Sequence, residues 1–120
     1  WGHQVVGANV QGRAMMSETF SQYSALMVME HEYGAPAMKK FLSYELDKYL
    51  QGRTRETKNE MPLILIENQN YIHYNKGSVV MYALKDYLGE AKLNSVLKKY
   101  LEQTKFQEPP YTNSLWSSPN

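Results

Sequence analysis

Three histidines are the first residues whose side chains could hold a metal ion or transfer protons. His3, His31 and His73 are scattered through a chain of 120 residues. His31 precedes Glu32, as in a zinc-binding H-E-x-x-H helix, but Ala35 occupies the position of the second histidine. The spacing therefore predicts no self-contained metal site, and we expect ordinary structural roles for all three imidazoles.

The composition excludes several other kinds of site. The chain has no cysteine, which rules out disulfides, thiolate zinc sites and cysteine nucleophiles. Gly2, Gly7 and Gly12 have a spacing that fits no phosphate loop or dinucleotide fingerprint, and there is no nucleophile elbow. The net charge of +1 gives no electrostatic reason to expect nucleic acid or an anionic membrane as a partner. No stretch approaches the ~20 apolar residues of a membrane helix.

Glu18 and Tyr74 are candidates for chemistry that also have simple structural explanations. Glu18 falls in the first turn of an expected helix, where the helix dipole favours a carboxylate. Tyr74 is one of ten tyrosines and precedes another expected helix, where a tyrosine often covers the core. Position and composition alone assign neither residue to a site.

Two helices are expected in the first half of the chain. Ser17 can cap the first helix, which should end at Gly34, and Pro36 favours the start of a second helix that should end at Gly52. The first helix has an apolar face at three-to-four spacing, formed by Phe20, Tyr23, Leu26, Met27 and Met29, with Glu30 on the same side. The second helix has one formed by Met38, Phe41, Leu42, Leu46, Tyr49 and Leu50.

The second half is expected to hold a long connection and two further helices. Arg53–Asn75 reads mostly as loop, with Met61–Ile66 as an apolar extended segment. A third helix is expected over Lys76–Leu88 and a fourth over Glu90–Thr104, with Gly89 between them. The residues expected to face inward are Val79, Val80, Ala83, Leu84 and Tyr87 in the third helix, and Leu93, Val96, Leu97, Tyr100 and Leu101 in the fourth.

The sequence thus predicts an all-α fold of about four helices, arranged as two helical hairpins with a long irregular connection. Residues 1–120 are expected to be a single fragment of a domain, with looped residues before Ser17 and an irregular tail from Gln107.

Several short motifs, in their order and spacing, resemble the gluzincin zinc aminopeptidases, the relatives of membrane alanyl aminopeptidase and leukotriene hydrolase. Glu18, followed by Phe20 and Tyr23, resembles the helix that delivers the third zinc ligand of that family. Trp1-Gly2 resembles the aromatic-glycine pair that follows the second zinc histidine, although the distance to Glu18 is one residue longer. Tyr74-Asn75-Lys76-Gly77 resembles the family's Y-x-K-G element.

The wider resemblance covers nearly the whole chain and favours one branch of these peptidases. Residues 1–9, 24–30, 71–74 and 109–111 are similar to bacterial proteins in which an aminopeptidase-like domain is joined to an ABC-transporter-type permease. The resemblance implies that the chain is the C-terminal part of a gluzincin catalytic domain, in a parent that is membrane-associated in a bacterium. The sequence itself indicates a soluble domain and leaves the compartment open.

The resemblance also implies roles for individual residues. Glu18 would be the third ligand of a zinc ion that two histidines hold, and Tyr74 would donate a hydrogen bond to the oxyanion of the tetrahedral intermediate. Lys76 and Gly77 would position Tyr74 at the entry of its helix. The H-E-x-x-H motif and its general-base glutamate are expected just before Trp1. The parent would therefore hydrolyse peptides with zinc-activated water, while this fragment alone is expected to be inactive and to bind no zinc.

Two other readings stay open at this stage. The chain could belong to a non-catalytic, peptidase-like helical interaction module that serves a membrane transporter, or it could be a helical domain whose motifs match by coincidence. The residues upstream of Trp1 would distinguish that module from an enzyme, since only the enzyme requires an intact H-E-x-x-H motif. Exposed apolar surface on the fragment also predicts self-association.

Overall fold

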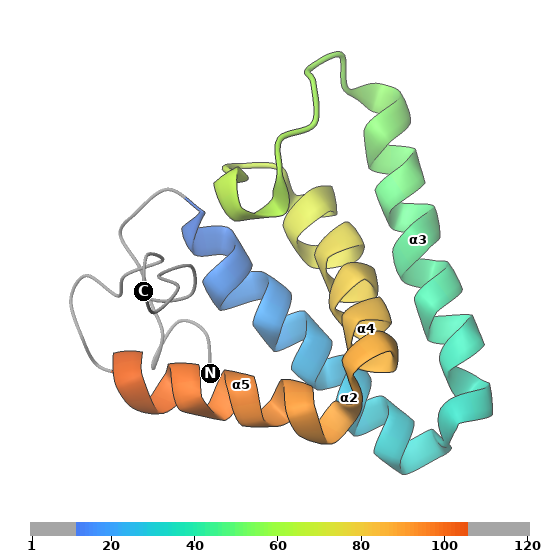
Figure 1. Cartoon of the computed structure of the whole chain (residues 1–120). Helices are drawn as coiled ribbons and strands as arrows, with labels where there is room; N and C mark the ends of the chain where they lie inside the picture. Colours follow the sequence, from blue (N-terminus) through green and yellow to red (C-terminus); the bar gives the residue numbers. More distant parts are fainter. Residues whose placement is uncertain (1–11, 106–120) are drawn as a thin grey trace.

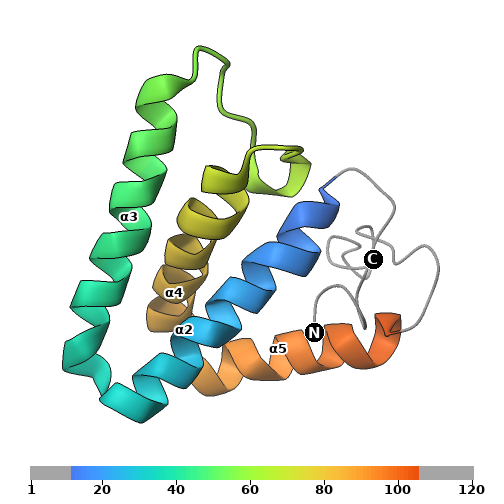
Figure 2. The ribbon, with the colours of Figure 1, turned by 180° about the vertical axis from the view of Figure 1, so that it is seen from behind.

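The computed structural model describes residues 12–105, and every regular element among them is helical (Figures 1 and 2). The four longer helices confirm the predicted all-α fold. In chain order the elements are a π-helical turn η1 (Met15–Thr19), α2 (Phe20–Tyr33), a 3-10 turn η2 (Ala35–Ala37), α3 (Met38–Arg55), a 3-10 turn η3 (Leu63–Leu65), a π-helical turn η4 (Tyr71–Lys76), α4 (Gly77–Leu88) and α5 (Glu90–Thr104). None of the helices within residues 12–105 has the length and apolar content to span a bilayer.

Helix α2 lies at the centre of the arrangement and packs against α4, while α5 leaves the end of α4 at a sharp corner (Figure 1). Both views show α3 at one side of the molecule, with the long connection returning from its end towards η4 (Figures 1 and 2). The closest packing of α3 is against η4. The turn η4 therefore lies between α3 and η1, the turn that precedes α2.

Two glycines make the sharp corners possible, as the sequence predicts. Gly34 and Gly89 have φ angles of +83° and +89°, which residues with a side chain rarely adopt. Their N–H groups donate to the carbonyl oxygens of Glu30 and Lys85, each at 2.8 Å, and so end α2 and α4. Both predicted helix ends are confirmed.

Two other predicted helix ends are wrong, each for a physical reason. Ser17 does not cap a helix, because the chain is already helical at Arg13 and the Ser17 hydroxyl donates to the Arg13 carbonyl at 3.1 Å. Gly52 does not end α3, which continues to Arg55. A side chain at position 52 would collide with the ring of Tyr71, so this glycine permits close packing inside the helix.

The predicted loop over residues 53–75 is shorter than expected at both ends. Helix α3 includes its first residues, and helical structure resumes at Tyr71, five residues before the predicted start at Lys76. Within the connection, the apolar segment forms the short turn η3 rather than an extended stretch, and Ile66 is fully buried. The connection is thus tied to the core at one apolar residue and reaches η4 in helical form.

The core lies where α2 meets the start of α3, α4 and α5. Its buried members are Met16, Phe20, Tyr23, Leu26, Met27, Met38, Met81, Tyr82, Leu93 and Tyr100. The rings of Phe20 and Tyr100 meet edge to face, with their centroids 6.3 Å apart. The predicted apolar face of the first helix is confirmed in these residues.

Several predicted inward positions of the other helices are exposed instead. These include Leu46, Leu50, Val80, Ala83, Leu84, Tyr87 and Val96. Polar residues take the buried positions beside them: Glu45 on α3, and Ser78 and Lys85 on α4. Each helix is therefore rotated so that one flank of its predicted apolar face points away from its neighbours.

Candidate functional site

The two site residues predicted from the sequence lie in direct contact. The Tyr74 hydroxyl donates a hydrogen bond to Glu18 Oε2, across a separation of 56 positions in the chain. The other carboxylate oxygen, Oε1, lies 3.4 Å from the Ser17 hydroxyl. Both Glu18 and Tyr74 are partly buried. The structure thus brings together a carboxylate and a phenol, while their roles as ligand and donor stay predictions.

Both residues lie on π-helical turns, η1 for Glu18 and η4 for Tyr74. A π turn holds one more residue than the α turn it replaces, and such turns are frequent at functional sites. Each turn continues directly into a regular helix, α2 or α4, that packs in the core. The irregular backbone is therefore held on rigid elements.

A close contact next to the pair fixes η1 against η4. The hydroxyl of Thr19 donates to the backbone carbonyl of His73 at 2.5 Å in a fully buried position. Gly77 permits this approach, because a Cβ atom there would lie 2.6 Å from Oγ1 and 2.8 Å from Cγ2 of Thr19. Thr19 follows Glu18 and His73 precedes Tyr74, so the contact sets the distance between the two site residues.

The connection after α3 holds η4 from its other side. The Lys76 ammonium donates to Glu60, and the Tyr49 hydroxyl donates to the same carboxylate at 2.7 Å. The Tyr71 hydroxyl donates to Glu56, and the two rings of Tyr49 and Tyr71 stack with centroids 6.1 Å apart. Lys76 is thus anchored to the connection, and Gly77 is packed on η1. The two residues predicted to position Tyr74 each have a contact through which they could do so.

The electrostatics of the pair favour a neutral tyrosine. The hydrogen bond to Glu18 raises the pKa of Tyr74 to about 12, and burial acts in the same direction. Burial lowers the pKa of His73, although the nearby Glu18 carboxylate opposes this effect. At neutral pH the phenol of Tyr74 is therefore a hydrogen-bond donor, beside a neutral imidazole.

The histidines differ more than the sequence suggested. His31 is exposed and its Nε2 lies 3.0 Å from Glu90, which fits the structural role expected for it. His73 is buried, its ring lies 4.8 Å from that of Tyr74, and its Nδ1 has no hydrogen-bond partner. His73 thus belongs to the site rather than to the general core. His3 lies outside the described residues, as do the Trp1-Gly2 pair and the tail from Gln107.

The described residues fit a zinc site only in part. Across residues 12–105 no three His, Cys, Asp or Glu side chains gather in a way that could hold a metal ion. Glu18 offers a carboxylate of the kind that zinc accepts, but a protein zinc site requires at least three ligands. This part of the chain can therefore supply one ligand and must receive the others from elsewhere.

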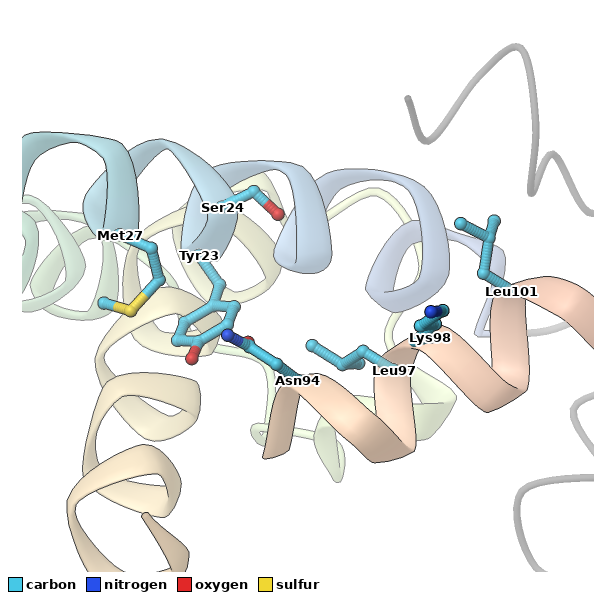
Figure 3. A pocket seen from close by; sticks show the side chains of 7 residues that line it. All are labelled: Tyr23, Ser24, Met27, Asn94, Leu97, Lys98 and Leu101. Carbon is cyan, nitrogen blue, oxygen red and sulfur yellow. The ribbon is translucent and has the colours of Figure 1, made fainter. Parts of the chain in front are cut away.

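A separate pocket of about 270 Å³ lies between α2 and α5 (Figure 3). It is lined by Tyr23, Ser24, Met27, Asn94, Leu97, Lys98 and Leu101. No histidine, cysteine or carboxylate is among these residues, so the pocket offers none of the side chains that usually bind zinc. It is distinct from the contact between Glu18 and Tyr74.

Several residues around the site were not singled out from the sequence. Thr19 and Glu60 act through contacts with distant segments, which no local pattern reveals. Glu45 gave the clearest signal, since it shares the inward spacing of Met38 and Tyr49 on α3 and yet carries a charge. A charged residue in an apolar register is a reason to look for buried partners.

Comparisons with known proteins place the chain among the peptidases. The chain belongs to peptidase family M1, whose domain matches residues 1–119. It is 28% identical over 112 residues to endoplasmic reticulum aminopeptidase 2 of Homo sapiens. The aligned region covers 86% of this chain and 11% of that protein. The chain thus spans about a ninth of the length of this relative. No solved structure matches it. The family match agrees with the resemblance to zinc aminopeptidases at the level of the family.

Proposed function

We propose that this chain is part of a zinc-dependent metallopeptidase domain of the aminopeptidase type. In this proposal Glu18 is one of the zinc ligands and Tyr74 is a catalytic residue that donates a hydrogen bond to the reacting carbonyl oxygen. The observation that carries the proposal is the direct contact of Tyr74 with Glu18 between the two π-helical turns η1 and η4. The name of the human relative supports the aminopeptidase type.

The chemistry of the two side chains suits these roles. When bound, zinc would polarise the substrate carbonyl and activate water. Glu18 would contribute a negatively charged ligand from η1, the turn that continues into α2. In the metal-free chain the hydrogen bond to Glu18 raises the pKa of Tyr74 to about 12. A phenol that keeps its proton can stabilise a developing oxyanion. The Thr19 contact with the His73 carbonyl would hold both groups in place as charge develops.

The remaining ligands would be two histidines of an H-E-x-x-H motif upstream of Trp1. The glutamate of that motif would be the general base. This division is consistent with the finding that no three potential metal ligands gather within residues 12–105. The attachment to a permease remains a prediction from the resemblance.

The test uses the full-length protein and measures zinc content together with hydrolysis of aminoacyl p-nitroanilides. Tyr74→Phe should lower kcat by about 100- to 1,000-fold and leave zinc bound, since removing one oxyanion donor typically has that effect. Glu18→Gln should reduce zinc content as well as activity. Tyr87→Phe is the matched control, because Tyr87 is 87% exposed on α4.

Full activity of Tyr74→Phe would contradict the role of the phenol. A full-length protein that lacks the H-E-x-x-H motif and binds no zinc would overturn the proposed enzyme. That result would instead favour the non-catalytic interaction module.

A further inference from the structure

Glu45 is a buried carboxylate to which no role has been assigned so far. It lies in the middle of α3 and is only 4% exposed. Its Oε1 accepts a hydrogen bond from the Gln22 amide at 2.7 Å, and its Oε2 accepts one from the Asn75 amide at 2.6 Å. No lysine or arginine in residues 12–105 forms an ion pair with it. Since an unpaired buried charge is costly, these two bonds must be important to the position of all three side chains.

The two partners of Glu45 stand next to the two site residues. Gln22 comes four residues after Glu18, about one helical turn along the same helix. Asn75 follows Tyr74 directly in η4. Glu45 therefore connects α3 both to α2, which continues directly from the turn η1 that carries Glu18, and to η4, which carries Tyr74.

A second link joins these elements without α3. It is the hydrogen bond from Thr19 to the His73 carbonyl, which uses the residues directly beside Glu18 and Tyr74. Two links thus lie beside the contact of Glu18 with Tyr74. One is the hydrogen bond from Thr19 to His73, and the other runs from Gln22 through Glu45 to Asn75. Both oxygens of Glu45 are engaged by amides, so it acts on the site through its neighbours.

We infer that Glu45 is a positioning residue, whose carboxylate holds the Tyr74 hydroxyl against Glu18 through Gln22 and Asn75. The position of the phenol depends on Glu45 as an acceptor of two hydrogen bonds, and the charge is secondary. The consequence for catalysis rests on the proposed function, while the consequence for the position of Tyr74 does not.

The position of the phenol can be followed by fluorine NMR of the full-length protein with a 3-fluorotyrosine label at Tyr74. Glu18→Ala gives the reference resonance of a phenol that has lost its acceptor. Glu45→Met, which has a similar volume and accepts neither bond, should shift the resonance to that reference. Glu45→Gln should keep the native resonance, because one partner amide can turn over and present its oxygen to the new amide group.

Two further variants keep the inference testable if Glu45→Met does not fold. Asn75→Ala removes the hydrogen bond between Asn75 and Glu45 and changes the core less than Glu45→Met does. It should produce the same shift of the fluorine resonance. Glu30→Met is the matched control, because it removes a partly buried glutamate at the far end of α2, which pairs with Lys85 of α4. This control should leave the resonance in place. A native resonance in folded Glu45→Met or Asn75→Ala would overturn the inference.

Kinetics separate this inference from the proposed function. In an active peptidase, Glu45→Met should lower kcat by about 10- to 100-fold, with zinc content and KM little changed, as expected for a misplaced catalytic group. Glu45→Gln should restore most of that loss. If the native protein proves to have no peptidase activity, the proposed function fails, and the fluorine resonances still decide whether Glu45 positions Tyr74.

Discussion

Tyr74 illustrates how one hydrogen bond changes the chemistry of a side chain. In the chain without added metal, the bond to Glu18 raises the pKa of Tyr74 to about 12 from an ordinary value of 10.0. Because the folded-state value is the higher one, the stabilisation from this bond is complete below pH 10 and is lost as the pH rises through about 12. The pKa values of Tyr23, Tyr71, Tyr82 and Tyr100 are raised as well, mainly by burial. We predict that absorbance titration at 295 nm shows one fewer late tyrosinate in Tyr74→Phe than in the native chain. A Tyr74→Phe curve that matches the native curve would show that the bond does not form.

A residue-scale prediction also concerns the buried pair of Lys85 and Glu30. The Lys85 ammonium donates to Glu30 at 2.8 Å and lies 4.0 Å from the centre of the Tyr82 ring. Burial opposes the charge of Lys85, but the hydrogen bonds with Glu30 and Tyr82 outweigh it and raise the pKa of the ammonium. Lys85→Met should cost about 3 kcal/mol of stability, since it leaves a carboxylate poorly paired.

Urea unfolding would measure the loss, with Lys98→Met on α5 as the exposed control. The double change Lys85→Met with Glu30→Leu should recover much of the stability, because it removes both charges. Equal stability of Lys85→Met and the native chain would show that the pair contributes nothing.

At the scale of elements, the contact between η1 and α4 depends on the absence of a side chain at Gly77. Gly77→Ala places a methyl group within 3 Å of two Thr19 side-chain atoms. We predict a loss of about 1–3 kcal/mol, despite the better helix propensity of alanine, because the packed Thr19 cannot retreat. Thr19→Ala should relieve part of this clash, so the double variant should lose less than the sum of the single variants. Strict additivity in urea unfolding would mean that the two side chains do not meet.

How far the elements could be predicted depends on whether their signals are local. The helix ends at Gly34 and Gly89 could be predicted, because a positive φ angle is needed there and glycine is the residue that adopts it most easily. The role of Gly52 could not be predicted, because it depends on the ring of Tyr71, which comes from the far end of the connection. Hydrophobic spacing predicted that α3 and α4 are helices, but it did not predict which side of each apolar face is buried against a neighbouring helix. Leu46 and Val80 were therefore assigned to the core although they are exposed.

The same distinction holds for the site. Glu18 and Tyr74 were found through the order of motifs along the chain, and the structure places them side by side. Thr19 and Glu45 could not be assigned in this way, since their partners His73 and Asn75 lie 54 and 30 positions away. Residues that support a site act across the fold, whereas residues that carry its chemistry are more often visible in a short motif.

At the scale of the whole molecule, the exposed apolar side chains on α3 and α4 lead to a prediction about assembly. Leu46, Leu50, Val80 and Leu84 are each between 37% and 49% exposed. Because such groups are better covered by a second molecule than by water, the isolated chain should self-associate as its concentration rises. Sedimentation velocity over a concentration series would detect this, and Leu46→Lys with Leu50→Lys should weaken it. A single monomeric species at high concentration would contradict the prediction.

The two π-helical turns restrict where residues can be inserted into the chain or deleted from it. In η4 the extra residue of the π turn sets the angle at which Tyr74 leaves the helix axis. Deleting one residue there would restore an α turn and swing the phenol by about 100° around that axis, away from Glu18. Residues 57–59 of the connection are exposed and precede Glu60, the residue that binds Lys76 and Tyr49. Single-residue insertions that are accepted in residues 57–59 should therefore be rejected in residues 71–76, even where every remaining side chain is unchanged.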